Sequence, residues 1–300
     1  MSLETFPYGD HALQTLTVAN LHPAPPLHDV KTGSGTETGS WVILIHGGAW
    51  RDPTQTSTSY LTPALEILRT SSSSFLRPIT NLASISYRLS AHPSHPQDPS
   101  TEPSTTLRAA KHPDHLVDIQ SALSFLQTKY GFGSNYILVG HSCGATLAFQ
   151  GVMPRLSSQK EYAAPLAILG MAGIYDLRLL RDSHKDISVY QDFIEGAFGS
   201  DESVWDSVSP AVAQGSEGIE GWESGKIAVL AHSQEDGLCD FIQSLKMQET
   251  LRAWEKGGKQ RNLHFLPIKG EHDEAWEKGV ELARGILFTL EKLRDMGIWS

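Results

Sequence analysis

The residues of this chain best suited to covalent chemistry are Gly-His-Ser-Cys-Gly at positions 140–144. A serine hydroxyl attacks carbonyl groups poorly unless it is held on a tight, accessible turn next to a base. The apolar run 136–139 predicts a buried strand before this segment, and the glycines on both sides of the serine permit a sharp turn into a helix. The pattern predicts a nucleophile elbow with Ser142 as the nucleophile.

A second glycine-containing segment, His-Gly-Gly-Ala-Trp at positions 46–50, directly follows a strand-like run at 41–45. Its glycines leave backbone N–H groups free to approach a developing oxyanion, and the amide of Cys143, just after the nucleophile, would be the second arm of the hole. The alternative is an ordinary Gly-Gly turn after a strand. Beside the elbow, the segment favours an oxyanion loop, in which His46 would fix the loop geometry rather than transfer protons.

A serine hydrolase with this motif order needs an acid and then a histidine, each on a loop after a strand and both C-terminal to the serine. The strand-like run 227–232 leads to Asp236, which we take as the acid, and the run 263–268 leads to His272, which we take as the base. Glu235 and Asp240 remain alternative acids because the register of the loop is open.

The other histidines have structural explanations. His232 and His264 fall within expected strands, where a histidine more often packs or hydrogen-bonds than catalyses, and we expect His141 to brace the elbow or the oxyanion loop. Histidine pairs at 92/95 and 112/115 have a spacing seen in metal sites, but no cysteine or carboxylate framework accompanies them. We expect no metal and no cofactor.

Composition favours a single globular enzyme domain over residues 1–300. The chain is 40% hydrophobic, enough for a large core, and its net charge of −10 leaves no basic face for nucleic acid. The N-terminus lacks the pattern of a secretory signal, and no window approaches the length of a membrane span. With two cysteines and no expected disulfide, the prediction is a cytoplasmic protein that acts on a small molecule and binds neither membranes nor nucleic acid.

Strand-like and helical segments alternate, which is typical of a mostly parallel sheet covered on both faces, the α/β class. Expected strands lie near 13–18, 41–45, 81–86, 136–140, 166–170, 226–231 and 262–267, and expected helices near 59–70, 114–129, 143–153, 238–256 and 276–295. Ligands bind beyond the carboxyl ends of the strands in such sheets. The candidate residues all follow strands, so the topology can bring them together.

Two segments look inserted. Residues 91–113, rich in Pro, Ser, Thr and His, predict a surface loop. Residues 175–215 would form a small lid over the serine, with a helix near 189–198. Aromatic residues in this segment, Tyr175, Tyr190, Phe193 and Trp205, are candidates for the substrate pocket, or they only pack the lid onto the domain.

The motifs at 46–50 and 140–144, together with Asp236 and His272, resemble the α/β-hydrolase fold and, within it, the hormone-sensitive-lipase-like esterases. More narrowly, a tryptophan in the His-Gly-Gly-x-Trp motif and the segment Phe-Pro-Tyr-Gly-Asp-His at 6–11 resemble the fungal kynurenine formamidases. Two departures, the insertion 91–113 and a loop-rich stretch near 215–225, look peripheral.

The resemblance implies hydrolysis of N-formyl-L-kynurenine in tryptophan breakdown. It assigns the triad to Ser142, Asp236 and His272, and the oxyanion amides to Gly48 and Ala49 of the His46-Gly47-Gly48-Ala49-Trp50 motif, beside Cys143. It also suggests a homodimer.

Two alternatives remain open. A general carboxylesterase would share these catalytic residues and differ in the shape of its pocket. A non-catalytic ligand receptor of the same fold is less favoured, because such receptors often lose the histidine that is present here as His272.

Overall fold

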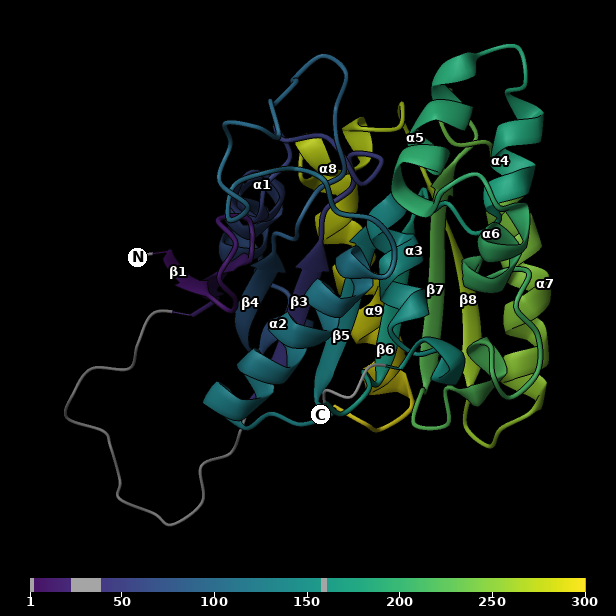
Figure 1. Ribbon diagram of the computed structural model, residues 1–300. Helices are drawn as coiled ribbons and strands as arrows, with labels where there is room; N and C mark the ends of the chain where they lie inside the picture. Colours follow the sequence, from purple (N-terminus) through teal and green to yellow (C-terminus); the bar gives the residue numbers. More distant parts are fainter. Residues whose placement is uncertain (1–2, 23–38, 158–160, 300) are drawn as a thin grey trace.

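The computed structural model describes residues 3–22, 39–157 and 161–299, and these form one sheet with helices on both faces (Figure 1). Within the described residues the sheet has eight strands in the order β1-β2-β4-β3-β5-β6-β7-β8. Their bounds are β1 Glu4–Pro7, β2 Thr15–Asn20, β3 Ser40–Ile45, β4 Ile79–Ile85, β5 Tyr136–His141, β6 Ala167–Met171, β7 Ile227–Ser233 and β8 Asn262–Ile268. Strand β2 pairs antiparallel with both β1 and β4, and the remaining neighbours pair parallel, which confirms the expected α/β class.

The α-helices follow the strands as the alternation predicts. They are α1 Ser57–Thr70, α2 Asp114–Tyr130, α3 Cys143–Gln150, α4 Leu177–Ser183, α5 Ser188–Phe198, α6 Glu202–Val208, α7 Ile242–Lys256, α8 Glu274–Glu277 and α9 Val280–Asp295. Figure 1 shows α2 and α3 on the near side of the sheet and α9 on the far side. The sheet is therefore sandwiched between two helical layers.

Both faces of the central strands are buried. In β3, Val42 and Leu44 pack in the cluster that contains α1 and α9, whereas Ile43 and Ile45 pack in the cluster that contains α2 and α3. A strand covered on both sides has no polar face, which explains the uninterrupted apolar runs in the sequence.

Strand β1 and the helix expected over 276–295 differ from expectation. Strand β1 is short and mostly exposed, so it carries little periodic signal, and the sequence did not predict it. The helix expected over 276–295 is divided into α8 and α9 at Gly279, whose φ is +70°. A Cβ there would lie 2.4 Å from the backbone of Pro63 in α1, so this close approach of two helices requires a glycine.

Three helices, α4, α5 and α6, fill the excursion between β6 and β7 (Figure 1, upper right). The sequence predicted α5 alone, because α4 and α6 are only seven residues each. The role of residues 175–215 as a lid stays a prediction.

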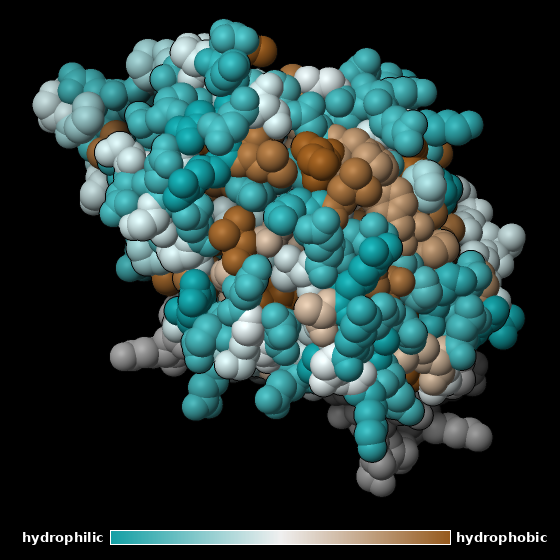
Figure 2. Space-filling model, turned by 90° about the vertical axis from the view of Figure 1, so that its right-hand side faces the viewer, coloured by the Kyte–Doolittle hydropathy of each residue, from teal (hydrophilic) through white to brown (hydrophobic). Residues whose placement is uncertain are grey.

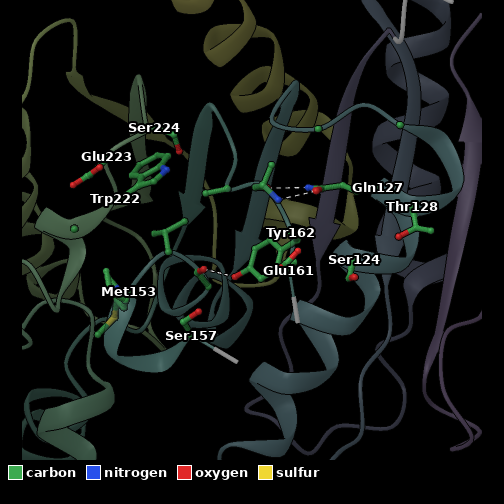
Figure 3. Close-up of a pocket in the computed structure, with 18 residues that line it drawn as sticks. Ser124, Gln127, Thr128, Met153, Ser157, Glu161, Tyr162, Trp222, Glu223 and Ser224 are labelled. Atoms are coloured by element: carbon green, nitrogen blue, oxygen red, sulfur yellow. Dashed lines mark hydrogen bonds between the residues drawn. The ribbon is translucent and has the colours of Figure 1, made fainter. Parts of the chain in front are cut away.

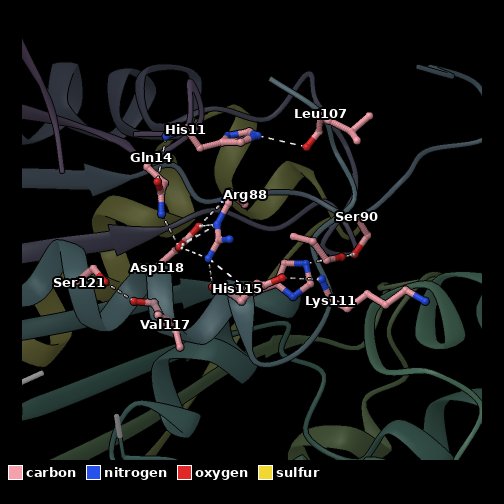
Figure 4. Close-up of polar contacts among 12 residues, drawn as sticks. His11, Gln14, Arg88, Ser90, Leu107, Lys111, His115, Val117, Asp118 and Ser121 are labelled. Atoms are coloured by element: carbon pink, nitrogen blue, oxygen red, sulfur yellow. Dashed lines mark hydrogen bonds and ion pairs between the residues drawn. The ribbon is translucent and has the colours of Figure 1, made fainter. Parts of the chain in front are cut away.

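The segment 91–113 contains no helix or strand, as expected for a loop. Hydrogen bonds nevertheless tie it to the body of the protein, and polar contacts join the residues that flank it (Figure 4). Arg88 donates to both carboxylate oxygens of Asp118 at 2.8–3.1 Å, and Gln14 donates to the same carboxylate at 2.8 Å. His11 contacts the carbonyl oxygen of Leu107 within the loop at 3.1 Å. The loop is anchored rather than loosely attached.

The stretch 215–225 is less peripheral than its composition suggests. It contains a 3₁₀ turn, η3 Ile219–Gly221, followed by Trp222, which is buried and stacks on Trp254 at 4.9 Å between ring centroids. Of the helices in the described ranges, none is both long and apolar enough to span a bilayer.

Candidate active site

Ser142 lies on the turn between β5 and α3, at the carboxyl end of a central strand. Its φ of +54° is strained for a residue with a side chain and must be held by its surroundings. A Cβ at Gly140 would lie 2.2 Å from the carbonyl oxygen of Gly144, and one at Gly144 would lie 2.3 Å from that of Ile45. Both glycines are therefore needed for α3 to approach the sheet, as expected for a nucleophile elbow. The Ser142 hydroxyl does not cap α3.

Asp236 and His272 follow neighbouring strands, β7 and β8, and contact each other. His272 Nδ1 donates to Asp236 Oδ2 at 2.8 Å, and the amides of Leu238 and Cys239 donate to Oδ1 at 3.0 and 2.8 Å. Burial by itself would raise the pKa of Asp236, but hydrogen bonds from His232 and His272 outweigh it and hold the pKa well below its usual value. The carboxylate therefore fixes His272 with Nδ1 protonated and leaves Nε2 available.

The two alternative acids have other partners. Glu235 accepts a hydrogen bond from the amide of Gly270 at 2.8 Å, and Asp240 lies 3.1 Å from Nε2 of His184. Among the three carboxylates that the sequence left open, only Asp236 has a recorded contact with the His272 ring. Glu235 instead supports the loop that carries the base.

A second histidine, His232, contacts the same carboxylate. Its Nε2 donates to Asp236 Oδ2 at 3.2 Å and to the carbonyl oxygen of Cys239 at 2.9 Å, so Nδ1 accepts from the Ser244 hydroxyl at 2.7 Å. The sequence predicted a packing or hydrogen-bonding role for His232, but not that its partner would be the candidate acid. This contact forms because the chain turns back after β7 and brings Asp236, four residues after His232, to the His232 ring.

His141, beside the serine, reaches the base instead of the nucleophile. Its Nε2 donates to the carbonyl oxygen of His272 at 3.0 Å, and the two rings lie 4.6 Å apart. Burial first, and then the neighbouring His272, keep the pKa of His141 well below its usual value, so the ring is neutral. We expected His141 to brace the elbow or the oxyanion loop; the recorded hydrogen bond braces the loop of the base.

The loop after β3 has three consecutive residues with positive φ, Gly48 at +93°, Ala49 at +48° and Trp50 at +59°. A tight turn of this kind is compatible with an oxyanion loop. The Trp50 amide donates to the Cys143 thiol at 3.3 Å, which links this loop to the elbow. Burial raises the pKa of that thiol to about 11, so it stays protonated.

His46 supports the same loop. Its Nδ1 lies 2.9 Å from the carbonyl oxygen of Gly47, and its ring stacks on Tyr87 at 4.5 Å. Burial lowers the pKa of His46 to about 4, so the ring is neutral near pH 7. These contacts agree with a role in fixing the loop geometry.

Ser142 and His272 line one cavity of about 420 Å³. Among the described residues, no hydrogen bond within 3.5 Å joins them, and such bonds often tighten only when substrate binds. Gly48 and Ala49 line the same cavity, and its apolar wall is formed by Ile174, Leu180, Ile187, Val189, Tyr190, Phe193, Leu238 and Cys239. The candidate catalytic groups thus face one pocket with a largely apolar side.

Of the predicted pocket aromatics, Tyr190 and Phe193 line this cavity. Tyr175 does not: its side chain is fully buried and packs edge-on against Phe149, and Trp205 is likewise fully buried. The excursion therefore uses some of its aromatics for the pocket and others for its own packing.

A larger cavity, of about 850 Å³, lies elsewhere, between the end of α2 and the loop residues 151–157, 161–164 and 221–224 (Figure 3). Its walls include Gln127, Tyr162 and Trp222 but none of the candidate catalytic residues. Size alone would select the wrong cavity, since the convergence of Ser142 and His272 marks the smaller one.

One group of side chains in the described ranges could offer a metal three ligands, His141, His272 and Asp273, with ligand atoms within 4.8 Å. Each histidine ring in that group already commits one nitrogen, His141 to the His272 carbonyl oxygen and His272 to Asp236. Those hydrogen bonds account for the positions of the two rings.

Sequence reasoning missed several residues of the pocket. Arg51, Asp52 and Gln55 line it just after the oxyanion loop, and His92 reaches it from the segment 91–113. The position of Arg51 next to the motif at 46–50 was the one available signal. His92 gave no signal, because its loop returns to the pocket only in the tertiary structure.

The chain is similar in sequence to several curated fungal proteins. It is 43% identical to "Kynurenine formamidase-like hydrolase fscH" of Fusarium equiseti, over 87% of this chain and 86% of that protein. It is 37% identical to "Kynurenine formamidase avaC" of Aspergillus versicolor, over 79% and 84%, and 30% identical to a kynurenine formamidase of Meyerozyma guilliermondii, over 82% and 79%. No protein-family model matches the chain.

Solved structures support the fold. A carboxylesterase from Lactobacillus plantarum superimposes with a TM-score of 0.64 at 15% identity, covering 100% of this chain and 99% of that one. Esterase B from Lactobacillus rhamnosus gives 0.63 at 18% identity, covering 99% and 85%. At such identities these structures show only the α/β-hydrolase fold. Together with the sequence relatives, they establish that this chain is a hydrolase of the kynurenine formamidase family.

Proposed function

We propose that this chain deformylates N-formyl-L-kynurenine to L-kynurenine and formate, with Ser142 as nucleophile, His272 as general base and acid, and Asp236 as the residue that orients His272. The observation that carries the proposal is the 2.8 Å contact between Asp236 and His272 Nδ1, at a pocket that His272 shares with Ser142. The names of the sequence relatives supply the substrate.

In the first half of the reaction, His272 Nε2 takes the proton of Ser142 as Oγ attacks the formyl carbon. Amides of Gly48, Ala49 and Cys143 stabilise the oxyanion, and loss of one such donor typically lowers the rate about 10²–10³-fold. When the intermediate collapses, the C–N bond breaks and the imidazolium gives its proton to the departing aryl amine. Kynurenine leaves, and the formyl group remains as an ester on Ser142.

In the second half, His272 takes a proton from water, whose oxygen attacks the formyl ester. Collapse breaks the bond to Ser142 Oγ, formate leaves, and the serine regains a proton from His272. Throughout, Asp236 stays ionised, which agrees with its depressed pKa. Its negative charge stabilises the imidazolium that forms in each half.

The shape of the pocket supports an aromatic leaving group. A formyl group needs almost no acyl pocket, so most of the 420 Å³ cavity is available to the amine side of the substrate. We propose that Tyr190 and Phe193 of α5, within a lid formed by residues 175–215, pack against the aromatic ring. Figure 2 shows hydrophobic side chains gathered on one part of the face it views. The exposed large apolar residues of α5, of α7 and of the segments just before these helices are Ile187, Val189, Leu238, Ile242 and Leu245.

The test is the hydrolysis of N-formyl-L-kynurenine by the purified protein, measured beside p-nitrophenyl acetate, with Ser142→Ala as control. We expect efficient deformylation that the variant loses by roughly 10⁴-fold or more. Rapid cleavage of the ester without the formamide would instead make the chain a carboxylesterase with a different leaving-group pocket. If neither compound reacted, the proposal would be wrong and the non-catalytic receptor would become the better interpretation.

A further inference from the structure

The walls of the catalytic pocket differ in charge. Besides the apolar residues, the lining includes Arg51, Asp52 and Gln55 from the segment after β3, together with His92. Arg51 is the only residue with a permanent positive charge among those that line the cavity. The protein as a whole has a net charge of −10, which repels anions, so a substrate carboxylate would need a local cation.

The Arg51 guanidinium forms no short-range ion pair among the described residues, and the acidic group that acts on it electrostatically, Asp192, lies beyond 4.0 Å. Among the described residues, no ion pair within 4.0 Å and no side-chain hydrogen bond engages it, whereas Arg88, Arg178 and Arg181 are all paired. Its nearest recorded contact is the ring of Phe193, with the guanidinium carbon 5.7 Å from the ring centroid. A half-buried arginine with its five donors unengaged is suited to bind an external anion.

Open space adjoins Arg51 on two sides. Besides the catalytic pocket it lines a second cavity of about 480 Å³ beneath the segment 91–109, and His92 borders both. Asp192 lines only the second cavity and Asp52 only the first, so acidic groups flank the guanidinium without neutralising it at short range. A carboxylate on the leaving group can therefore reach Arg51 without displacing a protein partner.

We propose that Arg51 is the residue that recognises a carboxylate on the leaving-group side of the substrate, and that it thereby selects aryl formamides with an amino-acid side chain over neutral or purely cationic ones. This inference rests on the proposed function. A contact from Arg51 to the substrate carboxylate involves neither the bond that forms nor the bond that breaks, so it contributes equally in the ground state and the transition state and acts chiefly on KM. The Phe193 ring holds the guanidinium at the boundary between the apolar wall and the polar wall.

The test compares two substrates that differ only in the carboxylate, N-formyl-L-kynurenine and its decarboxylated analogue with the formyl group on the aryl amine, N-formylkynuramine. For Arg51→Gln we expect kcat/KM to fall roughly 10-fold to 100-fold on the first, mostly through KM, and less than about 3-fold on the second. Arg51→Lys keeps the positive charge but loses the planar guanidinium group. We therefore expect its kcat/KM on N-formyl-L-kynurenine to lie between the values of the wild type and of Arg51→Gln.

Arg77→Gln is the matched control, since it removes one positive charge from an exposed position outside the pocket. It should leave both substrates unchanged, and thermal unfolding midpoints would confirm that all variants fold. Equal losses on both substrates would mean that Arg51 supports the oxyanion loop, and unchanged kinetics would mean that it is idle; either result overturns the inference. If the wild type hydrolysed neither formamide, the proposed function itself would fall and this inference with it.

Discussion

Two buried aspartates, Asp118 and Asp236, have side chains that are each 1% exposed, yet they lie in opposite kinds of polar network. Asp118 is held by the guanidinium of Arg88 and the amide of Gln14, in polar contacts beside the two ends of the segment 91–113 (Figure 4). Asp236 is held by two histidines and two backbone amides at the edge of a cavity.

The difference lies in what the partners can do. Arginine keeps its proton at every relevant pH, so the pair of Asp118 and Arg88 is a fixed joint. Histidine, unlike arginine, has a ring nitrogen that can accept a proton in a reaction, and one of the two histidines around Asp236, His272, faces a pocket that also contains Ser142. Burial of a carboxylate therefore does not by itself indicate a catalytic role. The histidine partner and the adjoining cavity are the features that distinguish Asp236 from Asp118.

Asp236→Asn should have the largest effect on activity. Because the amides of Leu238 and Cys239 both donate to Oδ1, the asparagine must place its carbonyl oxygen there and its NH₂ group toward His272 Nδ1. His272 would then accept at Nδ1 and carry its proton on Nε2, the wrong tautomer for a base. We expect kcat to fall about 10⁴-fold with an unchanged fold, measured by steady-state kinetics and circular dichroism. A loss below 10-fold would contradict the role of Asp236.

Asp118→Asn should lower the stability of the protein and leave its activity nearly unchanged. It removes the charge that Arg88 pairs with, and such losses cost about 3 kcal/mol, the lower end for buried pairs because the Arg88 side chain is 28% exposed. We expect that decrease in the free energy of unfolding, measured by urea titration, while kcat per folded molecule changes less than about 3-fold. A loss of activity in a fully folded variant would erase the distinction between the two networks.

The anchoring network should also affect the pH dependence of stability, through His115. Burial is the main cause that lowers the pKa of His115 to about 3, with smaller contributions from His112 and Arg88. Between pH 6.5 and 3 the unfolded chain therefore binds a proton at this site that the folded protein does not, so stability falls as the pH is lowered. His115→Gln should reduce the slope of unfolding free energy by about 1.4 kcal/mol per pH unit between pH 6 and pH 4. An unchanged slope would show that His115 is protonated in the fold.

Ser244→Ala should give the smallest effect. The serine hydroxyl donates to His232 Nδ1 at 2.7 Å, and His232 in turn holds Asp236. We expect a loss of about 1 kcal/mol in stability, the usual contribution of one hydrogen bond, and a decrease in kcat of less than 10-fold with KM unchanged. Ser233→Ala is a suitable control, since its hydroxyl binds the Glu235 amide instead. If Ser233→Ala lowered kcat more than Ser244→Ala, the rigidity of the loop after β7, rather than His232, would hold Asp236 in place.

Much of the architecture was predictable because its signals are local. The seven strands β2 to β8 were found to within a few residues, whereas the exposed β1 and the short α4 and α6 were not. The helix start expected at 238 was too early by four residues, since the amides of Leu238 and Cys239 turn back to cap Asp236 before α7 begins at Ile242. Boundaries set by a side-chain contact leave no periodic trace in the sequence.

The sequence by itself determined the α/β class and the candidates for nucleophile, base and oxyanion loop, because glycines required by a strained turn and apolar runs required by a doubly covered sheet are both local patterns. Only the tertiary structure shows that Asp236, rather than Glu235 or Asp240, contacts the His272 ring, since that contact joins residues 36 apart in sequence. It also decided that Tyr175 packs inside while Arg51 and His92 border the pocket. Those outcomes follow from how separate loops fold back over the carboxyl ends of the strands. No local sequence pattern encodes which residues meet there.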